Sequence, residues 1–216
     1  MGPVGSNVNR PYDSGRRRAR SAETRQRIID AARELVLDVG YRATTVAAVA
    51  AKAEVNVDTV YELVGRKPVL LRELIEQSIS GTDHAVVAEE RDYVDAIAAE
   101  TDPAEKLAIY ARAVRQIQER MAPLFLALRD ASVTEPEAHE TWEEISRRRA
   151  TNMRKLAREL RAANGLRSDL SIDEAADMIW ATASSELYVL LTVERGWTPH
   201  RFEQWLTDTW RRTLLP

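Results

Sequence analysis

Apolar residues in the first third of the chain recur every three or four positions, which is the spacing of one face of an α-helix. The first run predicts a helix whose apolar face carries Ile28, Ala32, Leu35, Val36 and Val39. Gly40 follows this run directly, and glycine commonly closes a helix. We therefore expect the first helix to end there.

A second and shorter helix is predicted after Gly40. Thr44 and Thr45 are N-cap residues. They stand directly before an apolar pattern at Val46, Val49, Ala50 and Ala53. The small side chain of Ala50 permits close approach of the next helix.

A third helix can begin at Asn56, another capping residue, and carries Val60, Leu63 and Val64 on its inner face. About three residues remain for the turn between the second and third helices, the length that a helix-turn-helix needs. Double-stranded DNA is therefore the expected partner. The outward side chains that a major groove would meet are Val57, Asp58, Tyr61 and Glu62.

A fourth helix is predicted from Lys67 and Pro68, because proline is favoured in the first turn of a helix. The pattern predicts further helices to the end of the chain. We expect a linker at 81–83, one short helix within 84–101 and a helix start at Asp102 and Pro103. Pro123 is expected to begin another short element, and the segment 135–163 to be the longest helix. The last two helices are predicted at 171–193 and 198–213.

No segment has the pattern of a strand, so the fold class is all-α. The predicted organisation is a basic arm at 1–20, a helix-turn-helix head at 21–67 and a larger helical domain at 68–216. The fourth helix joins the head to that larger domain, which we expect to hold the dimer interface and an effector site.

Several motifs of the head occur together and in order. They are the alanine pair Ala31 and Ala32, then Gly40 with Tyr41, the cap Thr44, Thr45 and Val46, and finally Thr59, Val60, Tyr61 and Lys67. In this order they make residues 25–79 resemble the DNA-binding head of the TetR family of bacterial transcriptional regulators. The resemblance implies that Thr45, Thr59, Tyr61 and Lys67 hold phosphates, while Val57 and its neighbours Asn56 and Asp58 approach base edges.

Two positions depart from the family pattern, and a third, Asp58, is an unexpected residue on the outer face. Glu54 stands where the turn usually carries glycine, and a positive φ there would cost roughly 1 kcal/mol. Val64 replaces the usual aromatic residue after the reading helix. Asp58 on the outer face can accept a hydrogen bond from cytosine N4 or can repel phosphates, and both interpretations stay open.

Charge is unevenly divided along the chain. Residues 1–67 hold 12 basic and 8 acidic side chains, whereas the rest holds 19 basic and 26 acidic ones, within a formal net charge of −3. Residues 1–20 contain Arg16, Arg17, Arg18 and Arg20 without apolar periodicity, which indicates a flexible arm. Directly before a DNA-binding head, such an arm is expected to contact phosphates or the minor groove through residues such as Arg18 and Arg20.

Composition narrows the function classes. The chain has no cysteine, which excludes disulfides, cysteine nucleophiles and a zinc ribbon. It shows no apolar run of membrane-spanning length and no secretory pattern, so we expect a cytoplasmic protein. Its eight glycines form no phosphate-binding loop, and no cofactor is indicated.

Tryptophans gather at the end of the chain. Trp197, Trp205 and Trp210 are three of the five, and they can serve the core or a subunit interface. The resemblance favours the interface, because in the TetR family the last two helices pair with their copies as a four-helix bundle. We therefore expect a homodimer through 171–193 and 198–213, with Trp205, Leu206 and Trp210 at the interface.

The resemblance also implies a pocket for a small apolar or amphipathic effector among the middle helices, and a repressor that such an effector releases from a palindromic operator. Large apolar residues on inward stripes are the candidates, although such residues also build ordinary cores. They are Tyr110, Met121, Phe125, Trp142, Met153, Trp180 and Tyr188.

Two alternatives remain beside this hypothesis. The first is a DNA-binding regulator of the same fold that has no small-molecule effector. The second, less favoured, is an all-α enzyme with a carboxylate-bridged metal centre, because several glutamates crowd near His139. That class needs Glu-x-x-His pairs, and the residues three positions before the histidines are Gly81, Pro136 and Trp197. We therefore expect no enzyme.

Overall fold

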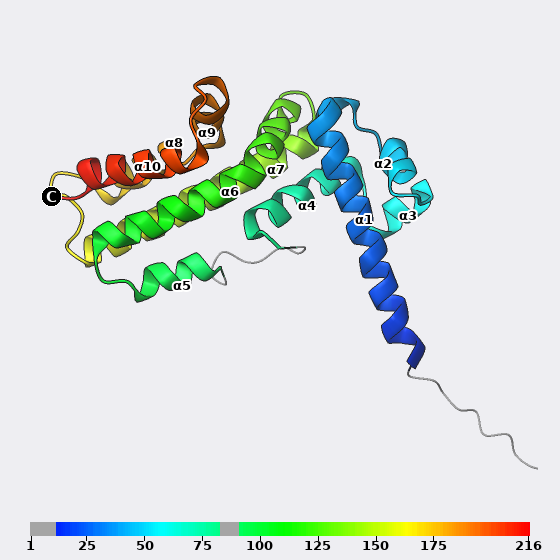
Figure 1. The fold of residues 1–216 in the computed structure, drawn as a ribbon, viewed down its shortest axis with the longest axis horizontal. Helices are drawn as coiled ribbons and strands as arrows, with labels where there is room; N and C mark the ends of the chain where they lie inside the picture. Colours follow the sequence, from blue (N-terminus) through cyan, green and yellow to red (C-terminus); the bar gives the residue numbers. More distant parts are fainter. Residues whose placement is uncertain (1–11, 83–90) are drawn as a thin grey trace, which may run out of the picture.

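The computed structural model describes residues 12–82 and 91–216, and every regular element in these two ranges is helical (Figure 1). The all-α prediction is confirmed. The N-terminal helices are α1 (Tyr12–Ala43), α2 (Val46–Lys52), α3 (Val57–Leu63) and α4 (Lys67–Ser80). After them come α5 (Asp92–Ala99), α6 (Pro103–Ser132) and α7 (Pro136–Ala162). The chain ends with α8 (Ile172–Thr182), α9 (Ser185–Val189), the π-helical turn η2 (Leu190–Glu194) and α10 (Pro199–Leu214).

Local sequence signals set the boundaries of the head. Gly40 takes a φ of 81°, which breaks α1 three residues before its end. The Thr45 hydroxyl accepts the N–H of Ala48 at 3.1 Å and begins α2. Glu54 has a φ of 55° in the turn between α2 and α3, so it carries the conformation that glycine usually supplies there.

α6 is the central helix of the molecule. It contacts α1 and α4 on the side of the head, α5 and α7 along its length, and α9 and α10 at the other side (Figure 1). Asp102 caps its start by accepting the N–H of Ala104, as the sequence predicts. One long helix therefore connects the head to the C-terminal helices.

The apolar core falls into two clusters. The first joins the head to the middle of the molecule, because residues of α1 to α4 pack with Met121, Phe125 and Leu128 of α6 and Ile145 of α7. The second joins α5, α6 and α7 to α8 and α10. The helix-turn-helix is therefore not a separate globule: its core crosses the boundary that the sequence places at residue 67.

Several predicted boundaries are wrong. The segment 12–20 is helical, as the first turns of α1, and not part of a flexible arm; the rest of the predicted arm, 1–11, lies outside the described residues. Pro123 lies inside α6 and begins no new element. The buried residues that follow it, Leu124 and Phe125, hold the helix together, since their packing offsets the cost of one missing N–H. α7 has 27 residues and is shorter than α1 and α6, which have 32 and 30.

The helix predicted at 171–193 is interrupted. Ala183 closes α8, and Ser184 starts a new helix by accepting the N–H of Leu187 at 3.2 Å. The backbone of Ser184 is extended, with φ −75° and ψ 152°, so the helix axis changes direction there. The apolar pattern alone cannot reveal this break, because apolar residues continue on both sides of it.

Two details of the head also differ from the prediction. Val39 is 49% exposed, and Ile29 takes part in the buried face of α1 instead. Asn56 precedes α3 as predicted, but its side chain makes no capping hydrogen bond.

The described part of the chain contains no helix long and apolar enough to cross a membrane. Within the same ranges, no group of His, Asp or Glu side chains could hold a metal ion.

Candidate functional site

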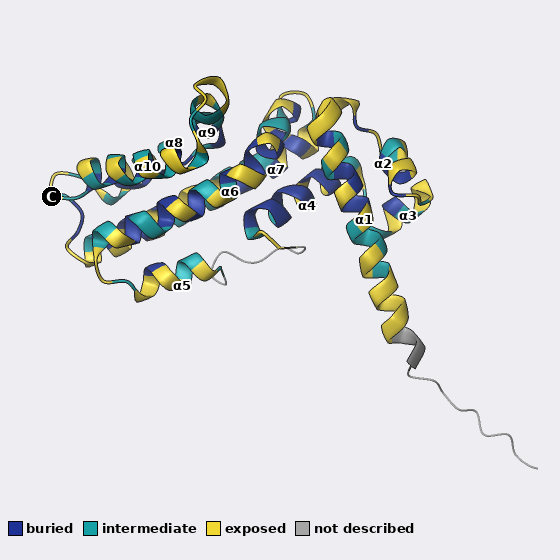
Figure 2. Ribbon diagram, viewed as in Figure 1, coloured by how far each residue is buried: buried dark blue, intermediate teal, exposed yellow. Residues whose placement is uncertain are grey.

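α3 presents a continuous outer face. Val57 is 37% exposed and Tyr61 is 50% exposed, and Asp58 and Glu62 lie in the open beside them (Figure 2). These positions are one turn apart, so they share one side of the helix. The opposite side is fixed by Val60, which is fully buried. This is the geometry that a helix needs to enter a groove while its other face stays packed.

Three polar residues frame this face. The Thr45 hydroxyl accepts from Ala48 and is exposed, so its own proton can be donated outward. The side chain of Asn56 is exposed and makes no capping bond at the start of α3. Thr59 is half-buried on α3. Asn56 and Thr59 thus belong to α3 and its start, and Thr45 lies at the start of α2, the helix that packs against α3.

Lys67 lies at the start of α4 and is partly engaged within the protein. Its ammonium lies 4.0 Å from the centre of the Tyr41 ring and donates to the Arg42 carbonyl at 3.3 Å. Burial lowers its pKa, and the nearby Glu135 partly opposes that shift. Lys67 therefore helps to join α1 to α4, in addition to any contact with DNA.

Tyr41 extends this connection to the C-terminal helices. Its hydroxyl donates to the Glu135 carboxylate at 3.0 Å, and burial together with that hydrogen bond raises the pKa of Tyr41. Beside it, Arg42 donates to the Thr134 hydroxyl at 3.2 Å. The corner between α6 and α7 thus holds the end of α1.

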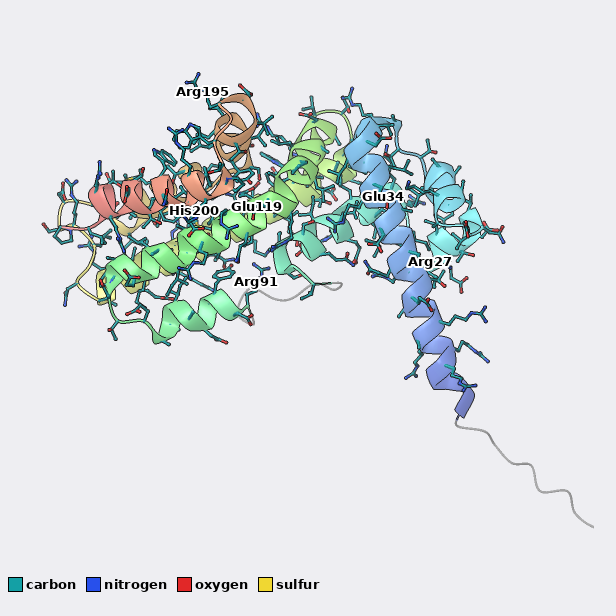
Figure 3. The ribbon with its side chains drawn as sticks, in the orientation of Figure 1. Arg27, Glu34, Arg91, Glu119, Arg195 and His200 are labelled. Carbon is teal, nitrogen blue, oxygen red and sulfur yellow. The ribbon has the colours of Figure 1, made fainter. Side chains whose placement is uncertain are left out.

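The first turns of α1 project away from the rest of the molecule (Figures 1 and 2). Arg18 and Arg20 are exposed there and form no ion pair with any residue in the described ranges. Farther along α1, Arg27 and Glu34 also point outward (Figure 3). Arg18 and Arg20 therefore sit on a helix that continues from the head.

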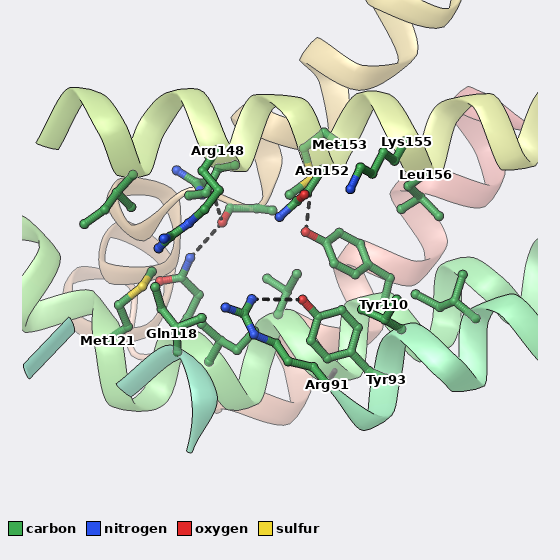
Figure 4. A pocket seen from close by; sticks show the side chains of 18 of the residues that line it. Arg91, Tyr93, Tyr110, Gln118, Met121, Arg148, Asn152, Met153, Lys155 and Leu156 are labelled. Atoms are coloured by element: carbon green, nitrogen blue, oxygen red, sulfur yellow. Dashed lines mark hydrogen bonds between the residues drawn. The ribbon is translucent and has the colours of Figure 1, made fainter. Parts of the chain in front are cut away.

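A cavity of about 280 Å³ lies between α4, α5, α6 and α7 and reaches the break between α8 and α9. Figure 4 shows Tyr110 and Gln118 on α6 facing Arg148, Asn152 and Lys155 on α7 across it. Ile97, Val114 and Leu156 are among its apolar walls. The volume is just below the roughly 300–1,000 Å³ of typical small-molecule sites.

Three of the seven residues named from the sequence as ligand candidates line this cavity: Tyr110, Met121 and Met153. The other four lie elsewhere. Phe125 and Trp142 belong to the core shared with the head. Tyr188 packs edge-on against Phe202 at 5.0 Å, and Trp180 is half-buried in the second cluster, beneath Arg149. These four fill the interior, as large apolar residues commonly do.

The sequence pattern did not predict the polar residues of the cavity. They are Arg91, Tyr93, Gln118, Arg148, Arg149, Asn152, Lys155 and Glu159. A signal existed on α7: Arg149, Asn152 and Met153 share a helical stripe with Ile145 and Leu156, so polar side chains interrupt an apolar face. Polar residues on such a stripe are missed when only large apolar residues are considered as ligand candidates.

The head of the chain matches a known protein family. Residues 28–74 match the family model described as bacterial regulatory proteins, tetR family. The head is a tetR-family DNA-binding domain. No curated protein matches the chain significantly in sequence.

Solved structures extend the likeness to the whole fold. A chain from Saccharomonospora viridis, described as a transcriptional regulator in complex with choline, is 18% identical with a TM-score of 0.69. The match covers 90% of this chain and 99% of that one. The transcriptional regulator FadR from Bacillus subtilis, in complex with stearoyl-CoA, is 19% identical with a TM-score of 0.69, over 85% and 96% of the two chains. The fatty acid degradation regulator FadR from Bacillus halodurans is 21% identical with a TM-score of 0.65, over 85% and 94%. The family match confirms the expected resemblance of the head to the tetR family, and the solved structures share the fold of the whole chain.

The surface around α3 generates a prediction about the roles of two residues. Lys67→Ala should weaken binding to all duplex sequences alike, since a phosphate contact carries no base information. Asp58→Ala should instead change which sequence is preferred. Fluorescence anisotropy measures both effects when each variant is titrated against a panel of duplexes that differ at the base pairs expected to face α3.

Lys52→Ala is the matched control, because Lys52 is a cation of the same head already paired with Glu34 at 2.7 Å. If Lys67→Ala altered sequence preference and Asp58→Ala did not, the assigned roles would be reversed.

Proposed function

We propose that the protein is a homodimeric repressor that binds a roughly palindromic operator through α3 and is released when a small ligand enters the cavity between α4 and α7. One observation carries the proposal: residues of the cavity wall also belong to the core that holds the DNA-binding head. They are Ile79 of α4, Met121 of α6 and Ile145 of α7. Since it binds chromosomal DNA, such a regulator would act in the cytoplasm.

These three shared residues are almost fully buried, with exposed fractions of 8%, 2% and 0%. Protein interiors are close-packed, so a ligand against them displaces packed neighbours as units and does not simply compress them. Ile79 is the most sensitive position, because it stands one residue before the end of α4. A ligand in the cavity would therefore act on the helix that leads directly from the head.

The end of α4 is held from two other sides. Arg33 of α1 donates to the Ser78 hydroxyl at 2.7 Å, and Arg120 of α6 donates to the Ser78 carbonyl at 3.0 Å. A shift of this end of α4 therefore requires rearrangement at α1 and α6. We infer that ligand binding favours a second arrangement of these contacts in which the two heads no longer fit both half-sites.

The neighbours support a ligand-responsive fold. The Saccharomonospora viridis and Bacillus subtilis structures contain choline and stearoyl-CoA. The comparable fold of this chain, with its own cavity, is the basis for assigning it an effector.

The dimer surface needs a correction to its predicted residues. Leu206 and Trp210 are fully buried within one chain, and the Trp210 indole donates to the Thr182 hydroxyl at 2.7 Å. They cannot also face a partner. We place the interface at exposed apolar side chains nearby, Leu190 at 44% and Val193 at 71%, beside the half-exposed Trp197 and Trp205.

Trp197 and Trp205 meet edge to face at 6.2 Å and form a rigid aromatic surface next to η2. Aromatic residues are enriched at interface cores, and a twofold axis would bring two copies of this surface together. A helix-turn-helix needs such a pair to contact two half-sites.

Arg18 and Arg20 provide a prediction for the helical extension of α1. If both neutralise phosphates, the double variant Arg18→Ala/Arg20→Ala should lower the salt slope of operator binding by about 0.9 per contact, or roughly 2 per subunit. Anisotropy titrations over a series of salt concentrations measure this slope. Arg154→Ala on the distant α7 is the control and should leave it unchanged; an unchanged slope in the double variant would show that the extension does not contact DNA.

The proposed function predicts linked losses at the dimer surface. The wild-type protein should select inverted repeats from a random duplex pool, with half-sites separated by about one helical turn or a multiple of it. Leu190→Glu/Val193→Glu should yield monomers that lose operator binding, because two symmetric copies would bury four unpaired carboxylates. Sedimentation velocity and anisotropy measure the two properties.

Val133→Glu is the matched control for the dimer test, since Val133 is 80% exposed at the corner between α6 and α7, away from η2. It should remain dimeric. A dimeric Leu190→Glu/Val193→Glu protein that still binds its operator would exclude this interface, and selection of unrepeated sites would contradict the operator model.

A further inference from the structure

Arg149 occupies an unusual place in the cavity. It projects from α7 toward the break between α8 and α9, where its guanidinium donates to the carbonyl oxygens of Ala183 at 3.2 Å and Trp180 at 3.4 Å. It also lies 5.4 Å from the Trp180 ring and 5.9 Å from the Phe125 ring. Among the described residues, no carboxylate comes within ion-pair distance of it. Its partners are therefore neutral groups.

A buried cation without a counter-ion is costly, and two long hydrogen bonds to carbonyl oxygens compensate only part of its lost hydration. Burial lowers the pKa of Arg149, and Tyr110 and the more distant Glu186, which is itself paired with Arg129, oppose that shift only in part. Although Arg149 lies deep in the bundle, it retains accessible surface, because it lines the cavity. An anion that entered the cavity could supply the missing counter-charge.

The other charged groups of the cavity wall also favour an anionic ligand. Among the residues that the structure describes, four cations line the cavity, Arg91, Arg148, Arg149 and Lys155, against one carboxylate, that of Glu159. Arg148 is already committed, since it pairs with Glu76 of α4 at 2.5 Å. Arg149 lies deep in the wall, and its hydrogen bonds and ring contacts are all with uncharged groups.

A second donor faces the same space. The Tyr110 hydroxyl donates to the Met153 sulfur at 3.0 Å, and a thioether is a weak acceptor. Burial raises the pKa of Tyr110, so its proton is retained. An oxyanion would be a better acceptor for this phenol.

Gln118 is not available in the same way. It donates to the Ala183 carbonyl at 2.7 Å and accepts from the Ser185 hydroxyl at 2.8 Å, so both ends of its amide are occupied. Gln118 fixes the carbonyl that Arg149 also contacts.

We propose that the cavity binds a small amphipathic carboxylate, with its anionic group on Arg149 and its apolar tail against walls such as Ile97, Val114 and Leu156. This inference rests on the proposed function only in taking the cavity as the effector site. A volume of about 280 Å³ suits a short tail. A quaternary ammonium such as choline would meet the like charge of Arg149 and should not bind at this site.

Octanoate is the probe, with 1-octanol as the uncharged analogue with the same number of carbon atoms and choline as the cation. Each is titrated into the full-length protein while tryptophan fluorescence is followed, since Trp180 lies beside Arg149. Octanoate should bind at least about tenfold more tightly than 1-octanol, the factor expected for a charge-assisted pair. Equal or tighter binding of 1-octanol or choline, or no binding of octanoate, overturns the proposal.

Arg149→Met removes the charge and keeps a long side chain, and it should weaken octanoate at least about tenfold while leaving 1-octanol unchanged. Arg149→Lys should bind octanoate with an intermediate affinity, which covers the case in which the methionine variant does not fold. Arg154→Met is the matched control on the same helix, because Arg154 is exposed and paired with Asp173 at 2.7 Å. If either Arg149 variant binds octanoate as tightly as the wild type does, Arg149 does not bind the carboxylate and the proposal is overturned.

Operator binding separates this inference from the proposed function. Ligand-free Arg149→Lys should bind operator as the wild type does, because the hydrogen bonds and ring contacts of Arg149 are with residues of α6 and the end of α8 and with none of α3. If octanoate binds through Arg149 but does not release the operator, the carboxylate site stands and the release step fails. If the operator is bound normally and octanoate is not, the inference fails and the DNA-binding function stands.

Discussion

The packing of the head against α6 is the constraint on which the rest of the structure depends. α1 to α4 do not close a core of their own: they share one apolar cluster with Met121, Phe125 and Leu128 of α6. α6 then continues to α9 and α10, so a single helix contacts both the DNA-binding end and the C-terminal end. Burial of this cluster stabilises the fold and also fixes the position of α3 relative to the cavity.

Electrostatics divides the molecule along the same axis. The first 67 residues have more basic than acidic side chains, and the remainder has an acidic excess. Within that acidic part, the described wall of the cavity has four cations and one carboxylate. The two positive regions suit two different anions, a phosphate backbone outside and a small organic anion inside, and the shared core lies between them.

The sequence predicts well those features that depend on neighbours along the chain. Gly40, Thr45, Asp102 and Thr198 mark helix boundaries through their own backbone or side-chain chemistry, and the structure places boundaries at all four. The outer face of α3 was also predictable, because a regular helix fixes which side chains lie opposite Val60.

Features set by distant contacts were not predictable in this way. Pro123 is tolerated because residues after it are buried against other helices, and the break at Ser184 coincides with a carbonyl that Gln118 and Arg149 contact from far along the chain. Leu206 and Trp210 look suited to an interface on the helix pattern, yet tertiary packing encloses them within one chain. The residues of the cavity come from five separate segments, so their assembly depends on the complete fold.

The central claim, that head and cavity share one core, is tested most directly by urea unfolding followed with two probes. Four of the five tryptophans lie between residues 180 and 210, and Trp142→Phe removes the fifth, which packs against the core shared with the head, so the fluorescence of that variant reports on the C-terminal helices. Amide hydrogen exchange of residues 28–63, measured across the same urea series, reports on the head. Because head and cavity share one core, we expect a single cooperative transition with coincident midpoints. A head that opens at clearly lower urea than the tryptophan signal would show that the two do not share one core.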